Sequence, residues 1–142
     1  MLHIILYQPE IPPNTGNIIR LCANTGAELH LVGPLGFQLD NTRVKRAGLD
    51  YAEMARVHQH VNWQAFRLAH PDMKTWAFST RGQKSYDQAQ FQQGDGLLFG
   101  PETRGLPDSV LTEVGFDNCL RLPMADASRS LNLSNTVAVG LY

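Results

Sequence analysis

LLFGPETRGLP, residues 97–107, is the most informative stretch of this sequence. An apolar run over 96–99 predicts a buried strand, which Gly100 and Pro101 end abruptly. A glycine at the carboxyl end of a strand lets a ligand approach the backbone, and open α/β sheets bind ligands at that edge. The segment therefore predicts either a ligand-binding loop or a tight turn before a helix over 108–114.

Strand-like apolar runs alternate with helical periodicities along the rest of the chain. This alternation predicts a single α/β domain over residues 1–142, built as a parallel-sheet α/β/α sandwich with helices on both faces. The expected strands span 2–7, 29–32, 74–79, 97–99 and 119–122, and the expected helices span 17–24, 40–47, 63–69, 108–114 and 132–142.

The segment PPNTG, residues 12–16, predicts a turn off the first strand. Asn14 or Thr15 would cap the helix that follows at 17–24, and Gly26 would close that helix. Gly16 would permit the tight turn, because glycine adopts conformations that other residues avoid.

The composition is that of an ordinary globular protein, and together with the charge it argues against several classes of protein. The net charge is −1, with 43% hydrophobic and 18% charged residues, so charge alone does not make the chain a nucleic-acid coat. The apolar runs fall short of the ~20 residues of a membrane span, and a signal-peptide pattern is absent, so no membrane association is expected. We expect Cys22 and Cys119 to be small core residues of a protein in the reducing cytoplasm.

Several common chemistries lack their sequence patterns. The chain contains neither a GxxxxGK[ST] phosphate loop nor a GxSxG elbow, and no dinucleotide fingerprint follows a strand. His58 and His60 would place two imidazoles on one side of a strand, but the sequence shows no third ligand, so no metal site is predicted. Hydrolase, kinase, dehydrogenase and metalloenzyme activities are therefore not expected.

Three polar segments each follow an expected strand. The first, NTGNIIR at 14–20, puts the cation Arg20 on an otherwise apolar helix. The second is the stretch 97–107, and the third is LPMADASRSLNLSN at 122–135, which holds more small hydrogen-bonding side chains than one helix cap needs. A parallel sheet would gather the three segments at one edge, as a backbone-lined cleft with an arginine and a set of amide and hydroxyl groups.

NTGNIIR, LLFGPETRGLP and LPMADASRSLNLSN together resemble the three motifs of the SPOUT-class RNA 2'-O-methyltransferases. The opening LYQPEIPPNTGNIIRLCANTGAELHLV is most similar to the small tRNA (cytidine/uridine-34-2'-O)-methyltransferases, which act on the wobble nucleotide. The resemblance spans essentially the whole chain. It implies a C-terminal trefoil knot, S-adenosylmethionine as the cofactor with S-adenosylhomocysteine as its product, no metal, and a homodimer with the active site at the subunit interface.

The resemblance also implies roles for the residues that match the motifs. Arg20 would reach the cofactor of the partner subunit, hold a phosphate and stabilise the developing alkoxide. Ser130 and Asn132 would orient the cofactor loop and the ribose, and Glu102 would either bind the cofactor's amino group or brace the knot. The implied cofactor-binding residues are Phe78, Ser79, Gly100, Glu102, Leu122 and Ser130.

The implied nucleic-acid partner is the anticodon arm of tRNA, not DNA, and no separate RNA-binding domain is expected. Phosphate contacts would position this arm without reading its bases. From the residues alone, the basic cluster at 43–46 also fits a solvated helix face, and Tyr142 also fits a core or interface aromatic. The implied RNA contacts are Arg43, Lys45, Arg46, Arg129 and Tyr142.

Three alternatives remain open from the sequence. The chain could methylate a 2'-hydroxyl at another position of tRNA or ribosomal RNA. It could be a non-catalytic RNA-binding module that keeps the knotted scaffold, although such a module has no need of a cofactor loop. A flavodoxin-like nucleotide-binding fold is the third, and the lack of a phosphate-cradling loop after the first strand weakens it.

Overall fold

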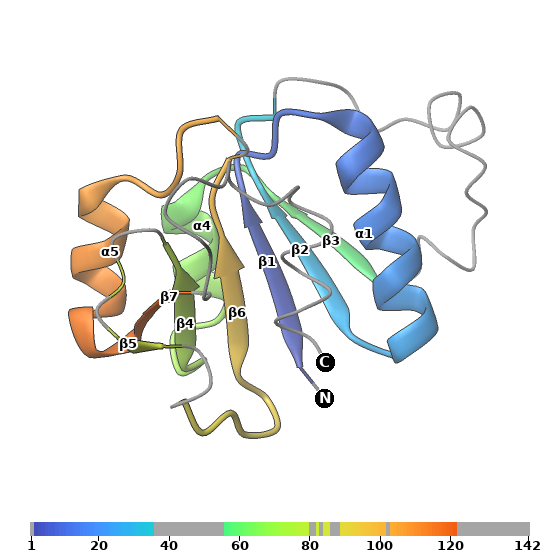
Figure 1. Cartoon of the computed structure of the whole chain (residues 1–142). Helices are drawn as coiled ribbons and strands as arrows, with labels where there is room; N and C mark the ends of the chain where they lie inside the picture. Colours follow the sequence, from blue (N-terminus) through green and yellow to red (C-terminus); the bar gives the residue numbers. More distant parts are fainter. Residues whose placement is uncertain are drawn as a thin grey trace, which may run out of the picture.

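A computed structural model describes residues 2–35, 56–79, 82, 84–85, 89–101 and 103–121. In this part of the chain, seven strands form one sheet in the order β3-β2-β1-β6-β4-β7-β5, and all neighbouring pairs are parallel (Figure 1). The predicted parallel sheet is therefore confirmed. The strands are β1 (His3–Tyr7), β2 (Glu28–Val32), β3 (Val57–His60), β4 (Thr75–Phe78), β5 (Lys84–Ser85), β6 (Gly96–Phe99) and β7 (Cys119–Arg121).

Helices cover both faces of the sheet, as the α/β/α prediction requires. Helix α1 (Pro12–Thr25) packs Ile18 and Ile19 against one face, in a core shared with β1, β2, β4 and β6. Helices α4 (Trp63–Ala69) and α5 (Asp108–Val114) pack Phe66 and Leu111 against the other face. Every residue of β4 and β6 is buried, which explains why these strands read as unbroken apolar runs in the sequence.

The segment PPNTG forms the first turns of α1, so the predicted turn over 12–16 is wrong. Helix α1 begins at Pro12 and has Ile11 as its N-cap, without a side-chain hydrogen bond at that cap. Proline suits this place because its missing N–H has no partner in the first turn and its φ angle is preset. Asn14, Thr15 and Gly16 are buried inside the helix, where none of them caps it or makes a tight turn.

The other helix ends follow the sequence more closely. Gly26 closes α1 as predicted, with a φ of 80° and its N–H donated to the carbonyl of Cys22. Helices α4 and α5 have the predicted bounds, and Asn62 caps α4 by accepting a hydrogen bond from the N–H of Ala65. A short 3-10 helix, Phe116–Asn118, leads from α5 into β7. The predicted helices over 40–47 and 132–142 lie outside the described residues.

β3 was not in the set of expected strands, although the spacing of His58 and His60 was considered on a strand, and β5 was not expected. β3 reads VHQH, which has no apolar run because two of its residues are exposed at the edge of the sheet. β5 has two residues, too few to produce a periodic signal. The buried Cys22 and Cys119 confirm that both cysteines are small core residues.

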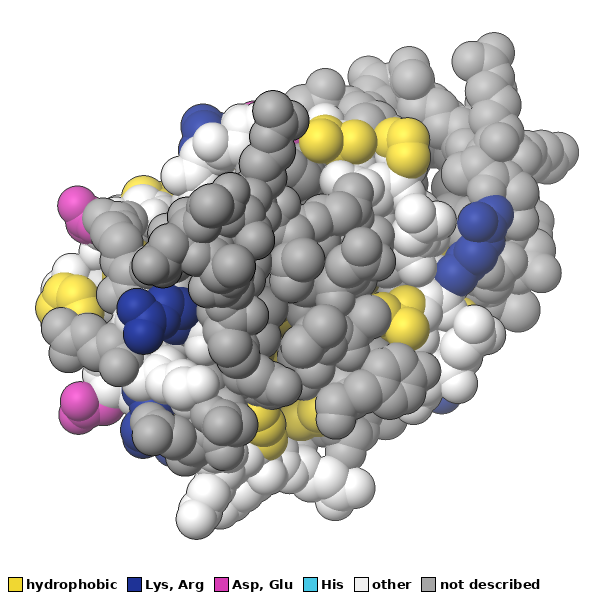
Figure 2. Space-filling view, viewed as in Figure 1, with side chains coloured by type: hydrophobic (Ala, Val, Ile, Leu, Met, Phe, Trp, Pro, Cys, Tyr) yellow, Lys and Arg dark blue, Asp and Glu magenta, His cyan; other side chains and the backbone are white. Residues whose placement is uncertain are grey.

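Most large apolar side chains of the described residues are buried in this fold. On the face drawn in Figure 2, the described hydrophobic side chains form separate small patches. Among the helices that the structure describes, none has the length and apolar character needed to cross a bilayer.

The hydroxyl of Thr15 generates a stability prediction. Its Oγ1 is buried and has no hydrogen-bond partner within the described part of the chain. An unpaired buried hydroxyl costs about 1–3 kcal/mol, so Thr15→Val is expected to leave the free energy of unfolding unchanged or to raise it. Urea unfolding followed by circular dichroism measures this change. The matched control is Thr25→Val on the same helix, because the Thr25 hydroxyl donates to the carbonyl of Leu21 at 2.8 Å.

The control variant is expected to lose up to about 0.5–1.5 kcal/mol, the usual net value of one hydrogen bond. A larger loss at position 15 than at position 25 would contradict the prediction, since it would mean that the buried hydroxyl holds a partner.

Candidate functional site

The carboxyl ends of β4 and β6 lie side by side and form the floor of the candidate site. Phe78 and Phe99 are register partners, and their rings stack with centroids 4.7 Å apart and planes 10° apart. Each strand ends there, so Ser79 and Gly100 follow at the same edge. The N–H of Ser79 donates to the carbonyl of Leu120 at 2.9 Å, which ties the end of β4 to β7. Three of the predicted cofactor-binding residues are therefore neighbours.

Gly100 is required by the path of the loop that follows β6. A Cβ atom at this position would lie 2.6 Å from the backbone nitrogen of Leu106 and 2.7 Å from the carbonyl carbon of Gly105. The loop thus folds back directly onto the end of the strand, and Gly105 takes a φ of 69° to make the turn. Close packing of backbone on backbone explains the glycine at 100, and the positive φ explains the glycine at 105.

Glu10 joins the loop after β1 to the loop after β6. Its carboxylate accepts hydrogen bonds from the N–H of Thr103 at 2.9 Å and from the Thr103 hydroxyl at 2.7 Å. Arg104 adds an ion pair with Glu10 at 3.6 Å and donates to the side-chain oxygen of Gln8 at 3.2 Å. The backbone N–H of Thr103, followed by its hydroxyl, lowers the pKa of Glu10 below its usual range.

This connection crosses the point where the strand order of the sheet reverses. β1 pairs with β2 on one side and with β6 on the other. The sheet therefore extends from β1 through β2 and β3 on one side, and through β6, β4, β7 and β5 on the other. Open α/β sheets bind ligands at such a switch point, outside the carboxyl ends of the strands. The loops after β1 and β6 meet there, in the upper part of Figure 1.

Arg20 lies well inside α1, not one turn from its start as expected from a helix beginning at residue 17. At the usual rise of about 1.5 Å per residue, Arg20 is about 12 Å along the helix axis from Pro12. Its side chain is half-buried. Because α1 begins at the carboxyl edge of the sheet and runs back across it, this position sets Arg20 apart from the edge where Ser79 and Gly100 lie.

Several predicted site residues lie outside the described residues, so their placement stays a prediction. They are Arg43, Lys45, Arg46, Glu102, Leu122, Arg129, Ser130, Asn132 and Tyr142.

Glu10 and Thr103 were missed by the sequence analysis. Glu10 stands in the polar stretch directly after the first strand, and Thr103 stands within the loop already singled out. The location of both at strand ends was a usable signal, but which two side chains would meet depends on β1 and β6 being neighbours.

With this geometry in place, the comparison with known proteins defines the class. The whole chain, residues 1–142, matches the SpoU rRNA Methylase family. The chain therefore belongs to this family of RNA methylases.

One group of relatives within that class is especially similar. The tRNA (cytidine(34)-2'-O)-methyltransferase of Saccharophagus degradans is 55% identical over 142 residues, which cover 100% of this chain and 92% of that protein. The protein of the same name from Escherichia coli K12 is 51% identical over 142 residues, which cover 100% of this chain and 90% of that protein.

Solved structures share the fold over nearly the full chain. A Bacillus anthracis protein has a TM-score of 0.91 and 46% identity, with 100% of this chain and 91% of that chain covered. A structure concerned with 2-OH methylation of C/U34 on tRNA has a TM-score of 0.87 and 48% identity, with 99% and 86% covered. The SpoU methyltransferase AviRb of Streptomyces viridochromogenes, in complex with AdoMet, has a TM-score of 0.79 and 26% identity, with 100% and 56% covered.

The Glu10 contacts generate a prediction about stability and pH. A carboxyl whose pKa is lower in the folded than in the unfolded chain stabilises the fold above the unfolded value, and this contribution is lost as pH falls through the folded value. Glu10→Gln is therefore expected to lower stability at pH 7 and to have less effect as pH falls below the ordinary glutamate pKa of about 4.3. Urea unfolding midpoints measured from pH 3 to pH 7 test this.

Thr103→Ala provides the matching partner for a double-mutant cycle. Glu10→Gln should lose part of its effect in the Thr103→Ala background, because the two side chains share one hydrogen bond. Additive effects of the two substitutions, or an equal effect of Glu10→Gln at pH 3 and pH 7, would count against the assignment.

Proposed function

We propose that this protein transfers a methyl group from S-adenosylmethionine to the ribose 2'-hydroxyl of the wobble nucleotide, C34 or U34, of tRNA. The observation that carries the proposal is the 55% identity over the entire chain to a tRNA (cytidine(34)-2'-O)-methyltransferase, of which 92% is covered. The matched range covers all three polar segments, which supports the roles proposed for their residues.

The edge formed by β4, β6 and β7 fits an adenosine-bearing cofactor. Phe78 and Phe99 stack in the apolar core next to these strand ends, and the ends at Ser79 and Gly100 supply backbone groups. Cofactor sites typically combine an apolar surrounding with a few placed polar groups. S-adenosylmethionine supplies an activated methyl group on a sulfonium that is itself a good leaving group.

Arg20 is the residue that we assign to the nucleotide. Its guanidinium can hold a phosphate through two parallel hydrogen bonds and stabilise negative charge that develops on the 2'-oxygen. A guanidinium carries only N–H donors and stays protonated in proteins, so it is a poor acceptor for the hydroxyl proton. Alignment of the hydroxyl with the methyl group therefore carries much of the rate, since orientation alone contributes about 7–11 kcal/mol.

We further propose that the active protein is a cytoplasmic homodimer in which Arg20 serves the cofactor of the partner subunit. The distance of Arg20 from the start of α1 supports this, because one chain holds its cofactor edge and its arginine in separate places. The same proposal includes the trefoil knot over the C-terminal segment and the RNA contacts. It also includes the cofactor contacts of Glu102 and Leu122 and the ribose contacts of Ser130 and Asn132.

Methyl transfer to tRNA tests the reaction and the target together. Tritiated S-adenosylmethionine is incubated with the dimer and total tRNA from a strain that lacks the wobble 2'-O-methylation, and the labelled nucleoside is mapped. We expect label in 2'-O-methylated C34 or U34. Label at another nucleotide would support methyl transfer to RNA but would contradict the proposed target nucleotide. No label with any RNA would reject the proposed function.

Arg20→Ala is expected to reduce the transfer rate about 10²- to 10³-fold, the usual effect of losing one oxyanion-stabilising donor, with the Kd for S-adenosylmethionine kept within about threefold. The matched control is Arg67→Ala, which removes an arginine of α4 that pairs with Glu113 on the other face of the sheet. This control should transfer at the wild-type rate. A parallel loss of cofactor affinity and rate would show that Arg20 is structural.

Complementation between inactive subunits tests the proposed sharing of the site. Gly100→Ala is expected to disturb cofactor binding, because the added Cβ meets the backbone of Leu106 at 2.6 Å. Mixed dimers of Arg20→Ala and Gly100→Ala would combine one intact cofactor edge with one intact arginine, and should recover up to half of the wild-type activity. Mixed dimers that stay inactive would place Arg20 in its own subunit's site. Gel filtration and circular dichroism verify that each variant is a folded dimer.

A further inference from the structure

All five histidines of the chain gather in one cluster on the polar half of the sheet. His3 stands on β1, His30 on β2, and His58 and His60 on β3, while His70 follows α4. The register pairs His30 with Ile5 and with His58, so the strand histidines project from the same face, the one that α4 covers. The sequence shows His58 and His60 without a third ligand nearby; the fold brings His30 and His70 to His60.

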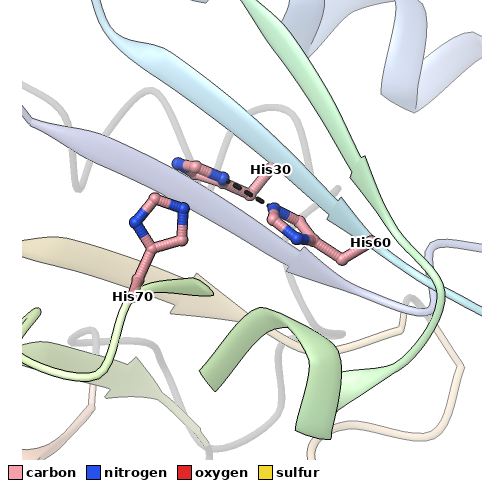
Figure 3. Close-up of side chains that lie close together, drawn as sticks. All are labelled: His30, His60 and His70. Atoms are coloured by element: carbon pink, nitrogen blue, oxygen red, sulfur yellow. Dashed lines mark hydrogen bonds between the residues drawn. The ribbon is translucent and has the colours of Figure 1, made fainter. Parts of the chain in front are cut away.

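Three members of the cluster have the geometry of a metal site. Nitrogen atoms of His30, His60 and His70 all lie within 4.8 Å of one another (Figure 3). His30 Nδ1 and His60 Nε2 are 3.0 Å apart. Imidazole nitrogens about 2.0–2.1 Å from a tetrahedral zinc ion lie about 3.4 Å from each other, so His30 and His60 are already spaced for one ion. His70 needs to approach by about 1.4 Å at most, which a rotation of its side chain supplies.

The environment of these rings suits metal ligands. Phe66 packs against all three, with ring centroids 5.1–5.4 Å away, and gives the site an apolar base. Burial lowers the pKa of His30 to about 3, and burial also lowers the pKa of His60. Neutral imidazole is the form that binds a metal ion, so these rings offer lone pairs at neutral pH.

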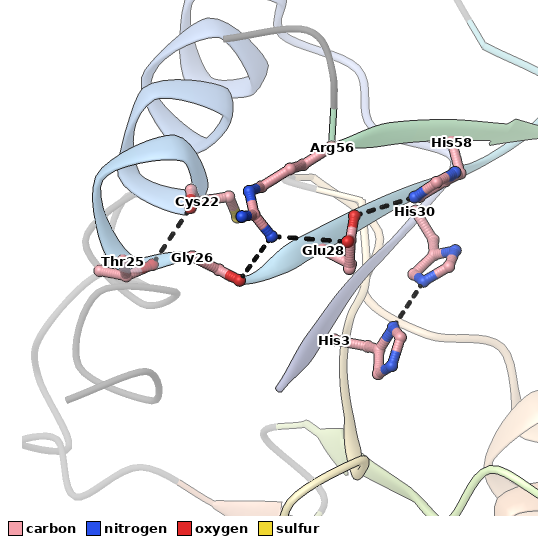
Figure 4. A network of polar contacts seen from close by, with 8 residues as sticks. All are labelled: His3, Cys22, Thr25, Gly26, Glu28, His30, Arg56 and His58. Carbon is pink, nitrogen blue, oxygen red and sulfur yellow. Dashed lines mark hydrogen bonds and ion pairs between the residues drawn. The ribbon is translucent and has the colours of Figure 1, made fainter. Parts of the chain in front are cut away.

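His3 supplies the outer contact that metal-binding histidines usually have. His3 Nδ1 lies 2.9 Å from His30 Nε2, on the opposite side of the ring from His30 Nδ1 (Figure 4). A hydrogen bond from His30 Nε2–H to His3 would leave His30 Nδ1 as a free lone pair and would hold the ring in place. A chain of hydrogen bonds through His3, His30 and His60 accounts for those contacts without an ion, but it does not require His70 to face the other two rings.

We propose that His30, His60 and His70 bind one divalent transition-metal ion of the zinc, nickel and copper class, with water at the fourth position. Imidazole ligands favour these ions over Mg²⁺ and Ca²⁺, which prefer oxygen. The site lies on β2, β3 and the turn after α4, whereas the candidate cofactor edge lies on β4, β6 and β7. The bound ion ties the edge strand β3 to its neighbour and to α4, and takes no part in methyl transfer.

Zinc binding to the dialysed, chelator-treated full-length protein tests this proposal. Isothermal titration with Zn²⁺ should show one ion per chain, and Co²⁺ should give the visible absorption of a tetrahedral nitrogen and oxygen site. His60→Gln and His70→Gln should each weaken Zn²⁺ binding by at least about 10–100-fold, and His3→Gln should weaken it about tenfold. The Co²⁺ spectrum needs only the wild-type chain, so it tests the site even if a variant fails to fold.

His58→Gln is the matched control, because His58 belongs to the cluster but its Nε2 lies 2.9 Å from the carboxylate of Glu28. This variant should bind Zn²⁺ within about threefold of wild type. Three results would overturn the proposal: no Zn²⁺ binding by the wild-type chain, equal loss of affinity in His58→Gln and His60→Gln, or a sulfur-to-cobalt charge-transfer band that identifies Cys22 or Cys119 as the ligand.

Discussion

The parallel pairing of β1, β6 and β4 is the constraint on which the rest of this structure depends. These strands are buried on both faces, so apolar side chains of neighbouring strands must meet helices above and below them. Because the strands point the same way, each loop that leaves a carboxyl end emerges at one edge. Glu10, Ser79 and Gly100, which are far apart in the sequence, meet at that edge for this reason alone.

The sheet divides into two halves with different chemistry. Its apolar half, around β4 and β6, has fully buried strands and carries the edge proposed for the cofactor. Its polar half ends in β3, an edge strand that exposes His58 and Gln59 and turns His60 toward α4. An edge strand with few apolar contacts gains little from burial. The pairs of Glu28 with Arg56 and His58 add to the backbone pairing of β3 with β2.

Much of the fold was predictable because local signals and tertiary packing agree. The apolar runs became strands, and Gly26 and Asn62 ended or began helices as their chemistry requires. The start of α1 was not predicted, because PPNTG consists of turn-forming residues; in the structure prolines occupy the first helical positions, and Asn14 and Thr15 are buried inside the helix. β3 was not among the expected strands, since its histidines and glutamine carry no apolar pattern and its pairing with β2 depends on the completed sheet; only the spacing of His58 and His60 was considered on a strand.

From the sequence alone, three motifs spread along the chain predicted the family, the alternation of strand-like and helical segments predicted the parallel sheet, and Gly100 predicted the end of a strand followed by a loop or turn. The tertiary structure decided which distant side chains meet. Glu10 contacts Thr103 only because β1 and β6 pair, and His30, His60 and His70 converge only because β2, β3 and α4 pack together. The physical reason is that strand pairing and helix packing join positions whose separation along the chain carries no local signal.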